Sequence, residues 1–257
     1  MIRVEDADEA LGWFVRKLEY EHTGRWESDT FANYFVKREG AAPEEMAVEL
    51  TYNYDGRSYT MGDAWGHIAV RVPDVRDGVA VICRVHPRAD RNDVVAANKE
   101  GKRVVAPAHI LHQRRVPLFD VDERVELVER EYGARWSLDH TMIRVENAEE
   151  ALGWYTRKLG YDLVRRSEHD SFALYFMQPG DAPREAMTVE LTYNYDGRNY
   201  ESGDAWGHLA VRAEDLQAFW ETLMDRHAED YRDPESCDNR YAFTKDMDGH
   251  EVEIVTP

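Results

Sequence analysis

The stretch VELTYNYDGR occurs twice in the chain, at residues 48–57 and again at 189–198, and GDAWGH also occurs twice, at 62–67 and 203–208. The first stretch alternates β-branched or aromatic residues with polar ones and ends in Asp-Gly, the pattern of a strand that runs into a turn. A strand and a turn repeated together in the same order indicate that one structural unit is present twice.

The duplication extends well beyond these motifs. At an offset of 141 positions, residues 1–72 align with residues 142–213 without a gap, and 45 of the 72 positions are identical. A period of this length is too long for a solenoid and indicates two copies of one domain. We therefore expect repeat 1 at residues 1–130 and repeat 2 at residues 138–257.

Residues 73–118 break the repeat. They carry nine Lys or Arg and five Asp or Glu, a net charge of +4, whereas the rest of the chain carries -23. The similarity resumes only weakly, between residues 119–129 and 245–255, so we interpret 73–118 as a segment read in a shifted frame or recently replaced. His109 and His112 in this segment have no carboxylate or Cys nearby, and we do not expect them to bind a metal.

The composition excludes several classes of protein. The 257 residues are 43% hydrophobic, enough for a buried core, and their net charge of -19 would repel nucleic acid and anionic membranes. Six Lys against 26 Arg on an acidic chain is typical of adaptation to high salt. Two Cys make no disulfide framework, and neither a signal peptide nor a membrane-spanning run is found, so we expect a cytoplasmic location.

Periodicity predicts an α+β fold made of four βαβββ modules, two per repeat, that form curved mixed sheets. In repeat 2, Asn147 is placed to cap a helix that Gly160 ends. The expected elements there are a strand at 140–145, a helix at 148–160, strands at 161–166, 171–176 and 186–194, then a strand at 208–212, a helix at 214–228, and strands near 230, at 240–245 and at 250–255.

Alternate residues of a strand share a face, so four strands of repeat 2 each direct one metal-ligating side chain toward a common concave surface. These side chains are His140, Glu190, His208 and Glu253. Two imidazoles and two carboxylates suit a divalent transition metal, although the spacing alone is a weak signal. Repeat 1 contains Glu49 and His67 at the same separation as Glu190 and His208. This repetition strengthens the prediction of a metal site.

The segments LDHTMIRV, AVELTYNYD, WGHLAV and DMDGHEVEIV resemble the ligand-bearing motifs of glyoxalase I, in the vicinal oxygen chelate superfamily. The resemblance implies a divalent metal, with Ni²⁺ or Co²⁺ favoured by a His at the first position and Zn²⁺ possible. The implied ligands are His140, Glu190, His208 and Glu253 in repeat 2, and Glu49, His67 and Glu126 in repeat 1.

The resemblance also implies an activity: proton transfer within the hemithioacetal of methylglyoxal and glutathione or another small thiol, giving an S-lactoyl thioester. Glu253, Glu190 and Glu126 are the implied catalytic carboxylates. The residues implied to hold the carboxylate of the thiol peptide are Arg144 and Asn194 in repeat 2 and Arg3 and Asn53 in repeat 1.

Members of this family build each site across two modules, so we expect a pseudo-dimer within one chain or a homodimer. One predicted site contains His140, Glu190, His67 and Glu126. The other contains Glu49, His208 and Glu253 without a first-strand ligand, because Met1 aligns with Met142 and the corresponding His would precede it. We expect translation to start upstream of Met1, and only one of the two sites to be fully competent.

Two other readings remain open from the sequence. One is a different proton-transfer enzyme of the superfamily, such as a methylmalonyl-CoA epimerase. The other is a module that binds a ligand without metal or catalysis, against which the retained imidazoles and carboxylates argue. The native metal, the physiological thiol and the oligomeric state stay undetermined at this stage.

Overall fold

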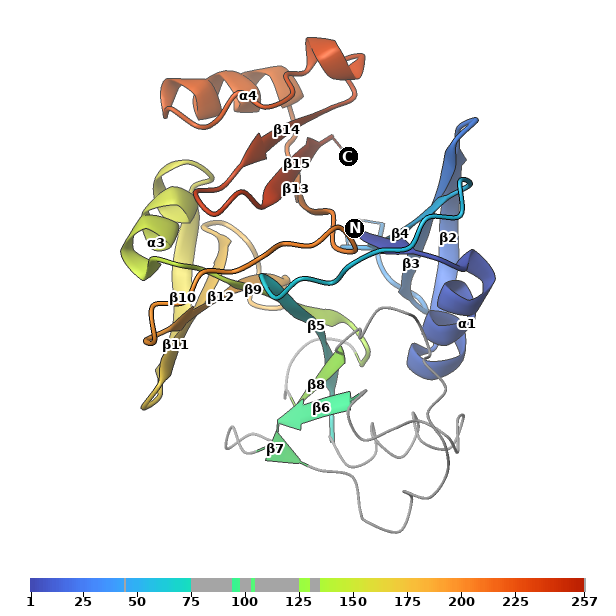
Figure 1. Ribbon diagram of the computed structural model, residues 1–257, viewed down its shortest axis with the longest axis horizontal. Helices are drawn as coiled ribbons and strands as arrows, with labels where there is room; N and C mark the ends of the chain where they lie inside the picture. Colours follow the sequence, from blue (N-terminus) through green and yellow to red (C-terminus); the bar gives the residue numbers. More distant parts are fainter. Residues whose placement is uncertain (44, 75–93, 98–102, 105–124, 130–134, 257) are drawn as a thin grey trace.

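The computed structural model describes residues 1–43, 45–74, 94–97, 103–104, 125–129 and 135–256. These residues form an α+β fold in which curved sheets are backed by helices (Figure 1), as expected. Two short strands, β6 (Val94–Ala97) and β7 (Arg103–Val104), come from the segment that breaks the repeat. His109 and His112 lie outside the described residues. So does most of the segment whose origin our hypothesis concerns.

The first and third modules are complete βαβββ units with the same topology. In each, the first strand pairs in parallel with the fourth, and the sheet then continues to the third and second strands. The first module consists of β1 (Ile2–Val4), α1 (Ala7–Leu18), β2 (Tyr20–Glu27), β3 (Phe31–Arg38) and β4 (Val48–Asn53). The third consists of β9 (Leu138–Arg144), α3 (Ala148–Arg157), β10 (Tyr161–Glu168), β11 (Phe172–Pro179) and β12 (Thr188–Asn194).

The second and fourth modules carry the remaining elements. They are β5 (Trp65–Val72) and β8 (Val125–Glu129), with β6 and β7, and then β13 (His208–Arg212), α4 (Leu216–Asp225), η2 (Glu235–Cys237), β14 (Tyr241–Lys245) and β15 (Glu251–Val255). The prediction of a strand near residue 230 is wrong. An isolated bridge from Arg232 to Phe243 is found there instead. Pro234, which lacks an N–H, begins the turn of η2 and stops the strand there.

The three α-helices of the described residues begin at side-chain caps and bury one face. Asn147 accepts from the N–H groups of Glu149 and Glu150, as expected, while Asp6 and Asp215 cap the other two helices. Trp13 and Trp154, at matching positions of the repeat, are both 7% exposed and pack in the core. The helix expected to reach Gly160 ends at Arg157, within the usual uncertainty of a helix end. No helix of the described residues is long and apolar enough to cross a membrane.

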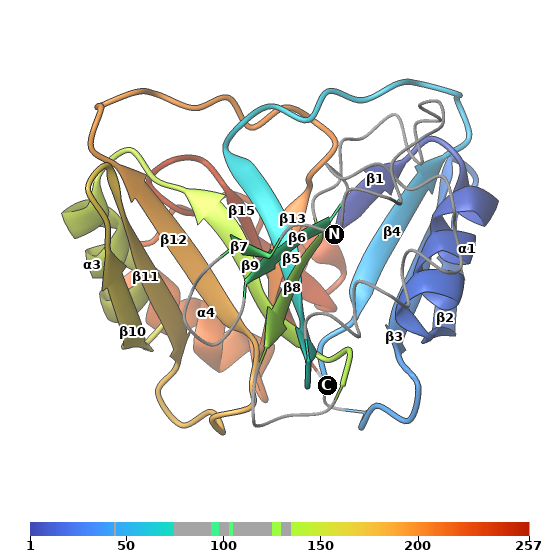
Figure 2. The ribbon, with the colours of Figure 1, turned by 90° about the horizontal axis from the view of Figure 1, so that it is seen from below.

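The two repeats share their sheets. Strand β5 of repeat 1 pairs antiparallel with β9 of repeat 2, so one sheet of eight strands runs from β10 to β7 through both repeats. On the other side, β1 forms an antiparallel bridge from Ile2 to Trp206, immediately before β13. Figure 2 shows β10–β12 with α3 and β2–β4 with α1 as opposite walls, with β5, β9 and β13 between them.

The repeated GDAWGH motif forms the crossing between the repeats. Gly62 and Gly203 have φ angles of +63° and +65°, and a Cβ on either would lie within 2.5 Å of the backbone nitrogen of the other. Only glycine tolerates both this conformation and this approach. Next to them, the rings of Trp65 and Trp206 stack 5.4 Å apart at an angle of 5°. The motif is therefore repeated because the two copies pack against each other.

Candidate metal centres

Four imidazole and carboxylate groups from both repeats converge in cluster A, which we define as His67, Glu126, His140 and Glu190. His140 Nε2 lies 3.1 Å from His67 Nε2, 3.2 Å from Glu126 Oε2 and 3.1 Å from Glu190 Oε2. His67 Nε2 lies 3.0 Å from the same oxygen of Glu126. The grouping predicted from the sequence is thus brought together, with two members from each repeat.

The strand register explains why Glu126 reaches cluster A. In the fourth module, Ala210 of β13 is opposite Glu253 of β15. In the second module, Ala69 of β5 is opposite Glu126 of β8. Ala69 and Ala210 occupy equivalent positions of the repeat. Glu126 and Glu253 are therefore structural counterparts, although the sequences around them are only weakly similar.

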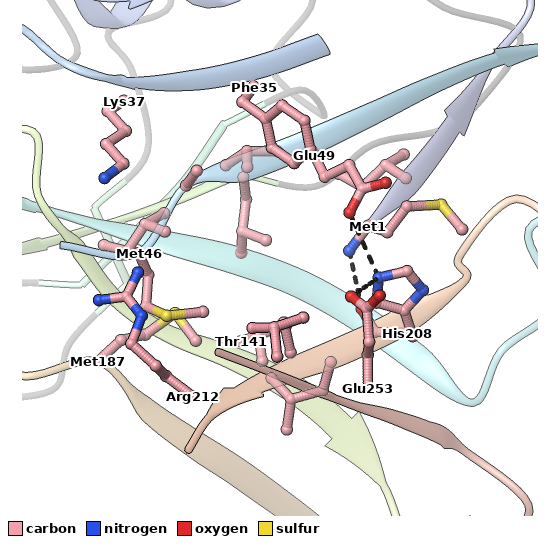
Figure 3. A pocket seen from close by; sticks show the side chains of 18 of the residues that line it. Met1, Phe35, Lys37, Met46, Glu49, Thr141, Met187, His208, Arg212 and Glu253 are labelled. Carbon is pink, nitrogen blue, oxygen red and sulfur yellow. Dashed lines mark hydrogen bonds and ion pairs between the residues drawn. The ribbon is translucent and has the colours of Figure 1, made fainter. Parts of the chain in front are cut away.

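Cluster B, defined as Glu49, His208 and Glu253, forms on the other side of the crossing. His208 Nε2 lies 3.0 Å from Glu253 Oε2 and 3.4 Å from Glu49 Oε2. Met1 lies beside these residues, and its amino group donates a hydrogen bond of 2.8 Å to the carbonyl of His208. Figure 3 shows Met1, Glu49, His208 and Glu253 gathered at one end of a pocket.

Burial and mutual attraction shape the charges of cluster A. Burial alone would lower the pKa of His140, but Glu190, Asp139 and Glu126 outweigh it and raise this pKa to about 10. Burial would likewise raise the pKa of Glu126, yet hydrogen bonds from His140 and His67 bring it well below its usual range. The carboxylate of Glu126 is therefore ionised at any physiological pH and is available as a ligand or a base.

Both clusters fit a divalent metal ion. The ligand atoms of His67, Glu126 and His140, and those of cluster B, lie within 4.8 Å of one another in each case. His208 Nε2 is buried and has no hydrogen-bond partner among the described residues, although two carboxylates are close. A buried imidazole nitrogen that faces two carboxylate oxygens is a donor set that suits a divalent cation.

Each of the four residues expected to hold a thiol peptide has an internal hydrogen-bond partner. Arg144 Nη1 donates to the carbonyls of Asp63 and Trp65, and Arg3 Nη1 donates in the same way to those of Asp204 and Trp206. The amides of Asn53 and Asn194 donate to Tyr59 Oη and Tyr200 Oη, at 2.6 and 2.7 Å. These contacts fix the orientation of all four side chains.

A cavity of about 580 Å³ opens beside cluster B. Arg3 and Asn53 line it, together with Arg232 and Arg240 from the fourth module. Trp26 lies on the same wall and is 43% exposed. Cationic and amide groups around an aromatic wall suit a small anionic organic ligand.

Sequence reasoning missed Asp139, a residue that contacts cluster A through His140. It precedes His140 on β9, and strict alternation would place it on the opposite face. Its carboxylate instead contacts His140 Nδ1 at 2.9 Å, with a side chain only 3% exposed. The one signal for it in the sequence was an acidic residue inside an otherwise buried strand.

Comparison with known proteins agrees with this geometry. Residues 137–254 match the family described as the glyoxalase/bleomycin resistance protein/dioxygenase superfamily. A probable lactoylglutathione lyase of Vibrio cholerae is 33% identical over 121 residues, which are 45% of this chain and 87% of that protein. A probable chloroplastic lactoylglutathione lyase of Arabidopsis thaliana is 27% identical over 220 residues, covering 83% of this chain and 58% of that protein.

The chain belongs to this superfamily. Among solved structures, glyoxalase I from Zea mays superimposes with a TM-score of 0.79 over 99% of this chain and 90% of that one, at 22% identity. At this identity the match shows the fold, including the arrangement of both repeats. The relatives similar in sequence are lactoylglutathione lyases, the class that the motifs of the chain resemble.

Proposed function

We propose that the protein is a metal-dependent lactoylglutathione lyase that isomerises the methylglyoxal–thiol hemithioacetal to an S-lactoyl thioester. One observation carries this conclusion: His67, Glu126, His140 and Glu190 converge from both repeats into one buried cluster of two nitrogens and two oxygens. Relatives similar in sequence over half of the chain or more carry the same activity in their names. The ion we propose is Ni²⁺ or Co²⁺, with Zn²⁺ as the alternative.

The reaction moves one proton between adjacent carbons and needs no oxidant. A carboxylate takes the proton from the carbon that bears sulfur, and the electron pair of the broken C–H bond forms a carbon–carbon double bond while the π pair of the neighbouring carbonyl moves onto its oxygen. A proton then returns to that neighbouring carbon, its oxygen becomes a hydroxyl, and the hydroxyl on the carbon that bears sulfur loses its proton and becomes the carbonyl of the thioester. A divalent ion held by the cluster supplies positive charge close to the oxygens of the substrate, where negative charge develops.

The carboxylates of cluster A are suited to this transfer. Glu126 is ionised because its imidazole neighbours lower its pKa, and it is positioned as the base that takes up and returns the proton. The role proposed for Glu190, whose Oε1 accepts a hydrogen bond of 3.1 Å from Thr192, is to act from the other side of the substrate. The equivalent base in cluster B is Glu253.

The thiol we propose is glutathione or another small anionic thiol. In the cavity beside cluster B, Arg3 and Asn53 are oriented by internal hydrogen bonds, and Arg232 and Arg240 add two further positive charges. Arg144 and Asn194 make the same internal hydrogen bonds as Arg3 and Asn53, which supports the same role for them at cluster A. A guanidinium recognises a carboxylate through two parallel hydrogen bonds, which favours a peptide thiol over a neutral one.

Turnover of the methylglyoxal–glutathione adduct by the full chain tests the proposal. We expect little activity after chelation and full recovery on addition of Ni²⁺ or Co²⁺. A double variant, Glu126→Gln with Glu253→Gln, preserves shape but removes both bases, and should stay inactive at every metal concentration. Equal turnover by this variant and the parent, or no metal-dependent turnover by the parent, would refute the proposed function.

Both clusters draw ligands from two repeats of one chain, which supports a pseudo-dimer within the chain as the active form. A monomer by light scattering that retains full specific activity is the expected result. Activity found only in a dimeric fraction would instead favour assembly between chains.

A further inference from the structure

Three buried side chains form a continuous chain of contacts that ends in cluster A. Arg71 Nε donates to Asp139 Oδ1 at 2.8 Å, and Asp139 Oδ2 lies 2.9 Å from His140 Nδ1. The side chains are 4%, 3% and 3% exposed, so water does not compete for these bonds. His140 Nε2, the other ring nitrogen, faces Glu126 and Glu190.

This arrangement determines which nitrogen of His140 carries a proton in a metal complex. An ionised carboxylate only accepts hydrogen bonds, so its contact with Nδ1 requires a proton on that atom. The lone pair of the neutral ring is then on Nε2, which points into cluster A. Carboxylates in this position orient a ligating imidazole and increase its basicity.

Arg71 holds the carboxylate in place. Its Nη1 donates to the carbonyl of Glu185 at 2.5 Å and contacts Ser137 Oγ at 3.4 Å, and its Nη2 donates to the carbonyl of Ala186. Arg71 belongs to β5 of repeat 1, whereas these partners belong to the segment around β9 and to the turn before β12 in repeat 2. The orientation of His140 therefore depends on contact between the repeats.

Cluster B has no such chain among the described residues. The counterpart of Arg71 in the repeat is Arg212, which is exposed and lines the pocket near cluster B instead of being buried. The residue before His208 is Gly207, which has no side chain to contact the ring. The same is true of Gly66 before His67. The chain of contacts thus acts on a single imidazole.

We propose that Asp139, held by Arg71, is a positioning residue that keeps His140 in the tautomer with a free Nε2 and so gives cluster A the higher metal affinity of the two. The proposal rests on the proposed function, because it takes cluster A to be a metal site. It assigns Asp139 and Arg71 no contact with substrate.

The test measures the Kd of Ni²⁺ by chelator competition in the full chain carrying His208→Ala, which leaves only cluster A. There, Asp139→Asn removes the charge with little change in shape and should raise the Kd about 10- to 100-fold. In the matched background His140→Ala, which leaves only cluster B, the same substitution should change the Kd less than about twofold. The second background shows whether the effect is local or follows from general loss of structure.

A second pair of variants guards against misfolding. Asp139→Asn leaves the buried Arg71 without its charged partner, which is costly, whereas Arg71→Met with Asp139→Leu removes both charges together. This double variant should lose metal affinity at cluster A as Asp139→Asn does. Arg71→Met alone releases the carboxylate that accepts from Nδ1, and should therefore also weaken Ni²⁺ binding at cluster A.

A spectroscopic signature separates positioning from simple packing. In the Zn²⁺-loaded protein with ¹⁵N-labelled histidine, His140 should carry its proton on Nδ1, and the double variant should lose this protected proton. An unchanged Kd at cluster A in both Asp139 variants, with the parent still binding Ni²⁺, would overturn the positioning role alone. Absence of Ni²⁺ binding by the parent would overturn the proposed function as well.

Discussion

Clusters A and B occupy equivalent positions of a duplicated chain, yet they differ in their ligands and surroundings. Cluster A has two imidazoles and two carboxylates, and Asp139 orients one of the imidazoles. The described ligands of cluster B are one imidazole and two carboxylates, and the amino group of Met1 lies beside them. The backbones that carry the two sets match closely in register, through Ala69 with Glu126 and Ala210 with Glu253.

The difference shows that the fold and the two clusters depend on different residues. The crossing at the repeated GDAWGH motif is nearly symmetric, because packing there tolerates little change in either copy. Each cluster, in contrast, depends on a few side chains, and the loss of one leaves the surrounding strands intact. A duplicated enzyme can therefore keep two similar frameworks while its two sites diverge.

The largest expected effect is on catalysis. Glu126→Gln should lower kcat/KM for the hemithioacetal by about 10²- to 10⁴-fold, because it removes the base of the better-equipped cluster. The matched control Glu253→Gln changes the equivalent residue of cluster B and should cost less than about threefold. Steady-state kinetics at saturating Ni²⁺ measure both values. A larger loss for Glu253→Gln than for Glu126→Gln would show that cluster B contributes more to catalysis than cluster A.

The next largest effect is on folding stability, at the nearly symmetric contact between the two GDAWGH motifs. Gly62→Ala and Gly203→Ala should each lower the free energy of unfolding by about 3 kcal/mol, because the new Cβ meets backbone atoms of the other repeat. Gly56→Ala is the matched control, with a similar positive φ but no atom within 4 Å of its Cβ, and should cost about 1 kcal/mol. Urea unfolding measures these costs. Unequal costs at Gly62 and Gly203 would contradict a symmetric crossing.

The two clusters should differ by a smaller factor in their affinity for metal ions. We expect two Ni²⁺ ions per chain with affinities that differ about tenfold or more, since Asp139 orients His140 in cluster A whereas Gly207 offers no carboxylate to His208 in cluster B. His140→Ala should remove the tighter event and His208→Ala the weaker one, as seen by calorimetric titration. Two ions of equal affinity would show that the orienting carboxylate adds no affinity.

The smallest effect is on the pH dependence of the folding stability, and it comes from His250 in the turn that precedes β15. Burial lowers the pKa of His250, but the carboxylate of Asp246, 3.0 Å away, and the charge of Asp248 outweigh burial and raise it. The folded protein thus holds this proton more tightly than the unfolded chain does, so the stabilisation is complete below about pH 6.5. It is lost as the pH rises through the elevated pKa, by ~1.4 kcal/mol for each unit of elevation.

Urea unfolding of the parent and of His250→Gln between pH 6 and pH 10 measures this contribution. The stability difference between the two proteins should be largest near pH 6 and should shrink as the pH rises. A difference that grows with pH would mean that burial, rather than Asp246, determines the charge of His250.

Much of the fold follows from the sequence, because strand alternation and helix capping are local signals. The βαβββ order of the first and third modules and the cap at Asn147 are confirmed. The strand expected near residue 230 is wrong, since the effect of Pro234 on a short polar stretch was not recognised.

The site was predictable in its members but less so in its surroundings. The cross-repeat grouping followed from the family resemblance and not from spacing, because no local signal tells which strands of two repeats will be neighbours. Asp139 and Arg71 are 68 positions apart and meet only through the pairing of β5 with β9. An interaction that depends on long-range pairing leaves no periodic trace in the sequence.

The sharing of strands between the repeats has a consequence for how the protein behaves on dilution. Separate subunits that contribute ligands to a common centre fall apart when their concentration drops below their dissociation constant. Here a covalent connection holds the partner strands at a fixed, high local concentration. Activity per chain should therefore stay constant in very dilute solution, with assembly governed by the length and stiffness of the connection instead of by the abundance of the protein.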